Sequence, residues 1–149
     1  MHNTEKISIK TVHVDKKIKN LVLWLNGFTS VRTLWSCQGF NEKEKKGMYD
    51  KVQEYFTEPI VPYPEDSYAY VVFTCNNLDH LYLIIDCIQE FKCYKKDIGL
   101  IKTEVSSDRE DKRLKYELVI ANQECPDMIV KYWNNVYKPR IINKTKLIP

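Results

Sequence analysis

The sequence predicts an α+β fold, because segments with helical and strand periodicity alternate along the chain. Apolar residues recur every three or four positions over 15–26, as in an amphipathic helix. Residues 68–75 instead alternate between two faces, and 98–121 predicts two strands around a polar loop. Taken in order, the segments give β-α-β-β-α-β, followed by one more strand and a C-terminal helix.

The first two elements are a strand over 7–14 and a helix over 15–26. Isoleucines and valines predict the strand, and Asp15 offers an N-cap to the helix. Gly27 stands where a helix C-terminus favours a left-handed residue. The expected buried stripe of this helix is Ile18, Leu21, Val22 and Leu25.

A second strand and a long insertion follow. β-branched and aromatic residues predict a strand over 31–35, which leads into a turn over 36–39. Residues 41–67 begin with a charged run, allow one short helix and contain three prolines near their end. We therefore interpret residues 1–149 as one domain with a 41–67 insertion between the second and third strands, and expect the insertion to cover or gate a site.

The third strand spans 68–75, and Asn76 or Asn77 caps the next helix. A hairpin of strands 98–106 and 113–121 follows, and the last helix starts at Pro126 and ends before Pro139. Apolar spacing predicts three buried sets: Leu78, Leu81, Ile85 and Ile88 in the helix, Leu114, Tyr116, Leu118 and Ile120 in the hairpin, and Ile129, Trp133 and Val136 in the last helix.

The element order matches the split βαβ arrangement of a ferredoxin-like sandwich, in which two helices cover one face of an antiparallel sheet. The second face is then either covered by the last helix and the 41–67 segment or free to receive a ligand.

Composition indicates an ordinary globular protein and leaves the partner open. The chain has 23 basic and 20 acidic residues among 149, a net charge of +3 that is too small to indicate nucleic-acid binding by itself. No apolar run approaches the roughly 18 residues of a membrane span, and no secretory signal is evident. We expect a cytoplasmic protein without membrane contact, with five reduced cysteines.

The segment 33–39, Thr-Leu-Trp-Ser-Cys-Gln-Gly, concentrates reactive polar groups. Gly39 permits close approach of a ligand to the backbone, and free N–H groups of a turn can face an anion. The Ser36 hydroxyl and the Gln38 amide can read a polar edge. The alternative is a structural turn in which Trp35 and Cys37 pack inward.

Neither catalysis nor metal binding is expected at this segment. No histidine is spaced to act as a base beside Cys37, so we assign no catalytic residue. The Cys87–Cys93 and His80–Cys87 spacings are not those of zinc sites, so we expect no metal and no cofactor.

The same segment resembles the Ser-Cys-x-Gly turn of the wybutosine-synthesising tRNA methyltransferases and of small phage and bacterial proteins that carry a Thr-x-x-Ser-Cys-x-Gly turn. The likeness covers about residues 15–40 and is carried by Ser36, Cys37 and Gly39. It implies a ligand-binding turn. Because Trp35, Gln38 and Phe40 depart from the enzyme pattern, methyl transfer is not carried over.

Residues 68–73, Tyr-Ala-Tyr-Val-Val-Phe, resemble the aromatic strand of RNA-recognition motifs, whose outward aromatic side chains stack on bases. The resemblance implies that Tyr68 and Tyr70 face a ligand. Asp66 and Ser67 replace the usual basic residue and glycine. The alternative is an ordinary strand with its tyrosines packed under the 41–67 segment.

Together these features predict a small cytosolic binding protein that receives a nucleotide-type ligand or a short RNA beside the turn, on the sheet face. An S-adenosylmethionine-dependent RNA-modifying enzyme and a phage-type protein-interaction or inhibitor protein are the alternatives. The expected ligand-binding residues are Thr33, Trp35, Ser36, Cys37, Gln38, Gly39, Tyr68 and Tyr70.

Overall fold

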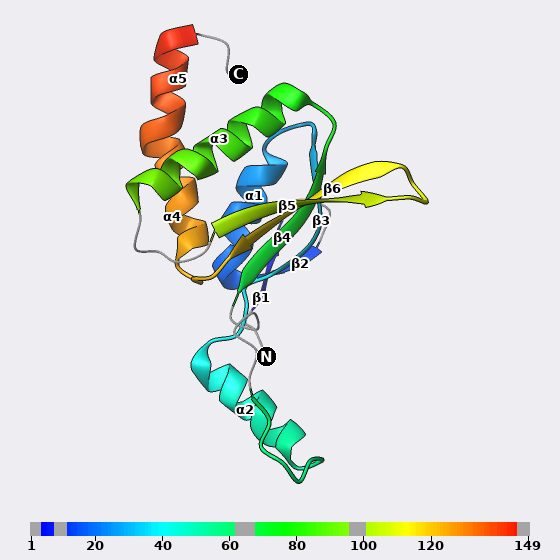
Figure 1. Cartoon of the computed structure of the whole chain (residues 1–149). Coiled ribbons are helices and arrows are strands. Elements are labelled where there is room, and N and C mark those ends of the chain that lie inside the picture. Colours follow the sequence, from blue (N-terminus) through cyan, green and yellow to red (C-terminus); the bar gives the residue numbers. More distant parts are fainter. Residues whose placement is uncertain (1–3, 8–11, 62–67, 96–100, 146–149) are drawn as a thin grey trace.

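The chain forms a mixed α+β structure, which confirms the predicted fold class (Figure 1). The structure is a computed structural model that describes residues 4–7, 12–61, 68–95 and 101–145. Its strands are β1 (Thr4–Ile7), β2 (Val12–Asp15), β3 (Val31–Cys37), β4 (Ala69–Cys75), β5 (Ile101–Asp108) and β6 (Arg113–Ile120). Its helices are α1 (Lys19–Asn26), α2 (Glu42–Gln53), α3 (Leu78–Tyr94), α4 (Cys125–Tyr132) and α5 (Lys138–Thr145), with a 3-10 turn η1 (Lys16–Ile18) and a π-helical turn η3 (Trp133–Tyr137).

Four strands form one antiparallel sheet in the order β3-β4-β6-β5. The expected first strand over 7–14 is instead a separate hairpin of β1 and β2, and its residues 8–11 lie outside the described residues. A ferredoxin-like sandwich would place that first strand inside the sheet. The ferredoxin-like topology is therefore not confirmed by the described strands.

Three helices, rather than the two expected, pack on one face of this sheet. Side chains of α1, α3 and α4 share a single apolar core with the inward residues of the strands, among them Val71, Phe73 and Leu118. Each such large side chain contributes about 1.5–3 kcal/mol when fully buried. The predicted stripe of the first helix is confirmed, since Ile18, Leu21, Val22 and Leu25 are all buried.

Other expectations for the helices need correction. Gly27 has a right-handed φ of −66°, so the left-handed prediction is wrong. A Cβ at Gly27 would lie 3.1 Å from the Trp24 carbonyl oxygen, so close packing favours glycine there. Asn77 does cap α3, by accepting from the backbone N–H of His80. The buried stripe of α3 is Ile84, Cys87, Ile88 and Phe91, whereas the predicted Leu78 is exposed.

The last helix continues through Pro139 instead of ending before it. A proline lacks an N–H and its ring collides with the carbonyl four residues earlier, which disfavours regular α-helix. Here the backbone widens into η3, where the N–H of Lys138 donates to the Trp133 carbonyl oxygen, and α5 follows. The widened turn leaves Val136 exposed and buries Tyr137, whose hydroxyl donates to Asp86 Oδ2 (2.7 Å).

The predicted hairpin of β5 and β6 is confirmed over its described part. The two strands are antiparallel and pair from Ile101 opposite Ile120 to Asp108 opposite Arg113. Residues 98–100 of the predicted strand lie outside the described residues. Leu114 was expected inside but is exposed, since the tip of the hairpin extends past the helices (Figure 1). Lys112 there has a positive φ of 57°.

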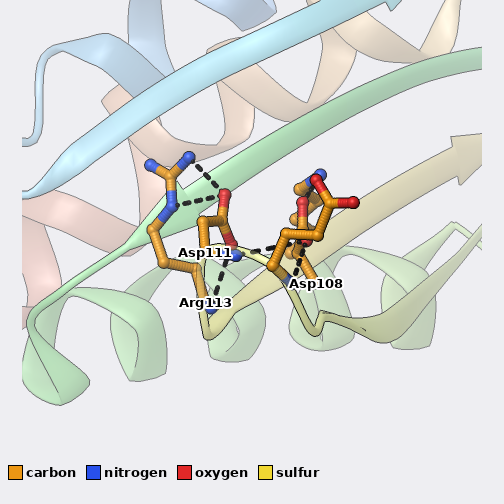
Figure 2. Close-up of polar contacts among 5 residues, drawn as sticks. Asp108, Asp111 and Arg113 are labelled. Atoms are coloured by element: carbon orange, nitrogen blue, oxygen red, sulfur yellow. Dashed lines mark hydrogen bonds and ion pairs between the residues drawn. The ribbon is translucent and has the colours of Figure 1, made fainter.

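Carboxylates fix this tip, as Figure 2 shows. Asp108 Oδ1 accepts from the N–H groups of Glu110 and Asp111, and Asp111 Oδ2 accepts from Nε and Nη2 of Arg113. Such side-chain acceptors replace the ladder partners that turn amides lack.

The described part of the 41–67 insertion does not cover the sheet. It contains α2, capped by a reciprocal pair in which Asn41 Oδ1 accepts from the Glu44 N–H and Glu44 Oε1 from the Asn41 N–H. No residue of α2 is buried, and the helix extends away from the sheet (Figure 1). Residues 62–67 lie outside the described residues. Within the described chain, the second sheet face therefore has no helix on it.

Candidate functional site

The second face of the sheet, here called the open face, is defined by strand register. Residues directly opposite each other in an antiparallel pair point to the same side. Trp35 pairs with Val72 and Cys37 with Tyr70, while the neighbouring Val71 points into the core. The open face therefore consists of Arg32, Trp35 and Cys37 from β3, Tyr70, Val72 and Thr74 from β4, Arg113, Lys115, Glu117 and Val119 from β6, and Lys102, Glu104, Ser106 and Asp108 from β5.

A β-bulge places Trp35 on this face. The register of β3 against β4 shifts between Thr33 and Trp35, so Leu34 is the extra residue. Without the shift, Trp35 would lie on the same side as Thr33, toward the helices. Bulges re-aim side chains in this way. As a result the Trp35 side chain is 52% exposed, and the alternative in which it packs inward is wrong.

Positive charge on the open face lies beside Trp35. The Lys115 ammonium stands 5.4 Å from the centre of the Trp35 ring and pairs with Asp108 Oδ2 at 2.9 Å. Arg32 is exposed and makes no ion pair with the described residues. Arg32 lies on β3, whereas Lys115 lies on β6 and reaches the Trp35 ring across β4.

Negative charge lies on β5 and on β6, the strand that also carries Lys115. Glu104 of β5 is directly opposite Glu117 of β6, and Lys102 Nζ pairs with Glu104 at 2.6 Å. An anionic ligand would be repelled by these carboxylates. The surface around Trp35, near Arg32 and the Lys115 ammonium, is therefore the better place for one.

The segment after β3 is held by internal hydrogen bonds. The N–H of Gln38 donates to Asp15 Oδ2 (3.0 Å), and buried Gln38 accepts from the Lys17 N–H through Oε1 (3.0 Å). The Gly39 N–H donates to Cys37 Sγ (3.4 Å), and the Gly39 carbonyl accepts from Gln123 Nε2 (2.9 Å). Both turn N–H groups are used internally, so the expected anion cradle does not form, and Asp15 holds the turn instead of capping a helix.

Cys37 and Tyr70 are neutral at neutral pH. Burial, followed by smaller effects that include the Asp15 carboxylate, raises the pKa of the Cys37 thiol, although the Gly39 N–H opposes this. Burial also raises the pKa of the Tyr70 phenol. A protonated thiol is a weak nucleophile. The two side chains thus offer a neutral, polarisable surface beside Trp35.

The structure brings together only some of the predicted site residues. Trp35, Cys37 and Tyr70 share the open face, and half-buried Tyr68 directly precedes β4. Ser36 lies in β3 opposite Val71 and points toward the helices. The remaining predicted residues have structural roles: Thr33 Oγ1 accepts from Asn26 Nδ2 (2.8 Å), and Gln38 and Gly39 anchor the turn.

Sequence reasoning missed Arg32 and Lys115. A signal for Lys115 was present, because it alternates with the predicted inward residues Leu114 and Tyr116. Arg32 adjoins the recognised segment, but its position opposite Thr74 depends on register.

No family model, curated protein or solved structure matches this chain. In the described ranges, no helix is long and apolar enough to cross a membrane. Those ranges also hold no group of three metal-ligating side chains.

Proposed function

We propose that the protein binds a nucleotide-type ligand, free or within a short single-stranded RNA, on the open face of the sheet. The observation that carries this proposal is the half-exposed Trp35 ring beside Cys37 and Tyr70, on a face without a described helix. A base stacked on an aromatic side chain contributes about 1–3 kcal/mol, and every base has a face to stack. Trp35 is the stacking surface, and Tyr70 flanks it.

The phosphate of such a ligand is attracted by Arg32 and Lys115. Lys115, which also pairs with Asp108, contributes its positive charge to this attraction. Glu104 and Glu117, directly opposite each other, disfavour a phosphate placed toward β5. We place this activity in the cytoplasm, where five unbridged cysteines are stable.

Binding is tested by fluorescence anisotropy with labelled oligouridylate and oligoadenylate, with AMP and S-adenosylmethionine as competitors. Trp35→Ala should weaken oligonucleotide binding by roughly 5- to 150-fold, which corresponds to the loss of one stacked base. Tyr70→Ala should weaken it less, because Tyr70 is only partly exposed. Tyr82→Ala removes an exposed aromatic residue from α3, on the opposite side of the sheet, and should change nothing.

Arg32→Gln should weaken binding and reduce its salt dependence, because one fewer phosphate is neutralised. Lys131→Gln on α4 is the matched control. Competition by AMP identifies a mononucleotide ligand, and binding of oligonucleotides alone identifies RNA. Absence of all nucleotide binding, or equal loss in Trp35→Ala and Tyr82→Ala, contradicts the proposal. Saturable binding of S-adenosylmethionine alone would favour the RNA-modifying alternative.

A further inference from the structure

A recess away from the open face lies where α1, α3 and the π-helical turn meet. Its volume is about 270 Å³, close to the lower end of about 300 Å³ for small-molecule sites. Its lining includes Trp24, Phe28, His80, Trp133 and Lys138. We call it the aromatic pocket.

Four rings give the pocket its character. The centres of Trp24, Phe28 and Trp133 lie 5.5–5.9 Å apart in pairs, in tilted and edge-to-face arrangements, and the His80 ring lies 5.6 Å from Phe28. Because the three large rings contact one another, they form a wall and not a cage around a void. A flat apolar molecule complements such a wall.

The π-helical turn supplies two of the lining residues together. In a regular α-helix, residues five apart differ by about 140° in direction, so Trp133 and Lys138 would not share a side. In η3 the Lys138 N–H donates to the Trp133 carbonyl oxygen, which closes one wide turn between them. Both side chains then line the pocket. Single π-helical turns occur frequently at functional sites.

The polar groups of the pocket favour an acceptor with negative charge. Lys138 makes no ion pair with the described residues, and no lining residue is acidic. His80 Nδ1 is 2.7 Å from Ser30 Oγ; when that hydroxyl donates, the ring carries its proton on Nε2.

We infer that the aromatic pocket binds a small planar aromatic carboxylate. The ring of the ligand packs on Trp133, Trp24 and Phe28, and its carboxylate offsets the charge of Lys138. A cationic ligand is disfavoured because Lys138 would repel it. This site is separate from the open face and does not depend on the proposed function.

Calorimetry with three ligands of nearly equal shape tests the inference: benzoate, neutral benzamide and cationic benzamidine. Benzoate should bind with one site per chain, about tenfold more tightly than benzamide, because its hydrogen bonds are charge-assisted. Benzamidine should bind most weakly. Indole-3-acetate serves as a larger anionic probe.

Variants assign the site. Lys138→Gln should reduce benzoate affinity about tenfold and leave benzamide affinity unchanged, since only the charge is removed. Lys131→Gln, an exposed lysine of α4 outside the pocket, is the matched control and should bind like the wild type. Trp35→Ala should leave benzoate binding intact, which separates this pocket from the open face.

Three outcomes would overturn the inference. The first is no heat of binding with benzoate or indole-3-acetate up to about 10 mM, a concentration well above a 1 mM Kd. The second is equal affinity for benzoate, benzamide and benzamidine. The third is unchanged benzoate binding in Lys138→Gln.

Discussion

Gln38 and Gly39 illustrate how single residues fix the end of β3. Gly39 adopts a φ of 78°, a left-handed conformation in which a side chain is strained. Gln38 beside it is buried and bonds to the chain on both its main-chain and side-chain atoms. The polar content of this segment thus stabilises the turn, while Trp35 and Cys37 face outward.

Two glycine variants test this account of the turn. Gly39→Ala should lower the free energy of unfolding by about 1–2 kcal/mol, the cost of a left-handed L-residue. Gly47→Ala lies inside α2, where an added Cβ meets nothing within 4 Å, and should not destabilise but raise local helix stability by up to about 1 kcal/mol. Urea unfolding measures the first effect and amide exchange in α2 the second. A neutral Gly39→Ala would contradict the assigned backbone conformation.

Cysteine environments predict an order of thiol reactivity. Cys93 is exposed, whereas burial, followed by the charges of Glu90 and Asp86, raises the pKa of Cys87 to about 12. Because the thiolate is the reactive form, iodoacetamide at pH 8 should modify Cys93 first and Cys87 last in the native protein. Mass spectrometry of peptides measures this order. In denaturant without reductant all five thiols should react with iodoacetamide. Modification of only three would indicate a disulfide.

The elements differ in how much of them the sequence predicts. Helix α1 and the alternation of β4 follow from periodicity, because one buried face repeats along each segment. The bulge in β3 and the π-helical turn break periodicity, and each is fixed by tertiary partners: the register with β4, and the burial of Tyr137. For that reason periodicity left the direction of Trp35 open between a ligand-binding and an inward-packed position, and the passage through Pro139 was not predicted.

The tip of the β5–β6 hairpin should lose its order on acidification. Lys115 lowers the pKa of Asp108 and Arg113 lowers that of Asp111, chiefly through side-chain hydrogen bonds. A carboxyl whose folded pKa is depressed stabilises the fold above its unfolded pKa of about 3.9, and this contribution is lost as pH falls through the folded value.

Carboxyl NMR titration should therefore give midpoints below about 3.9 for both residues. Arg113→Gln should raise the midpoint of Asp111 more than that of Asp108, and Lys115→Gln should do the reverse. Ordinary midpoints in the wild type would show that the contacts in Figure 2 are not maintained in solution.

At the scale of the molecule, the arrangement of strands was the least predictable feature. Periodicity marks a strand and its buried face but not its neighbour, since many pairings bury the same face. In place of the first predicted strand the structure has the separate pair of β1 and β2, and three helices pack on one face of the sheet. That segregation leaves the open face without a described helix, although Val72 and Val119 on it are buried. Three residues of the predicted site lie together there: Trp35, Cys37 and Tyr70.

The central claim, that the open face is the ligand-binding surface, is tested most directly by mapping where a ligand contacts the protein. Amide and side-chain NMR shifts of the labelled protein are followed during titration with a short single-stranded oligouridylate. The account predicts perturbations at the Trp35 indole and at outward residues of β3 and β4, including Arg32 and Tyr70, with α3 and α4 unchanged. Perturbations confined to the helical side, or none at saturating RNA, would contradict it.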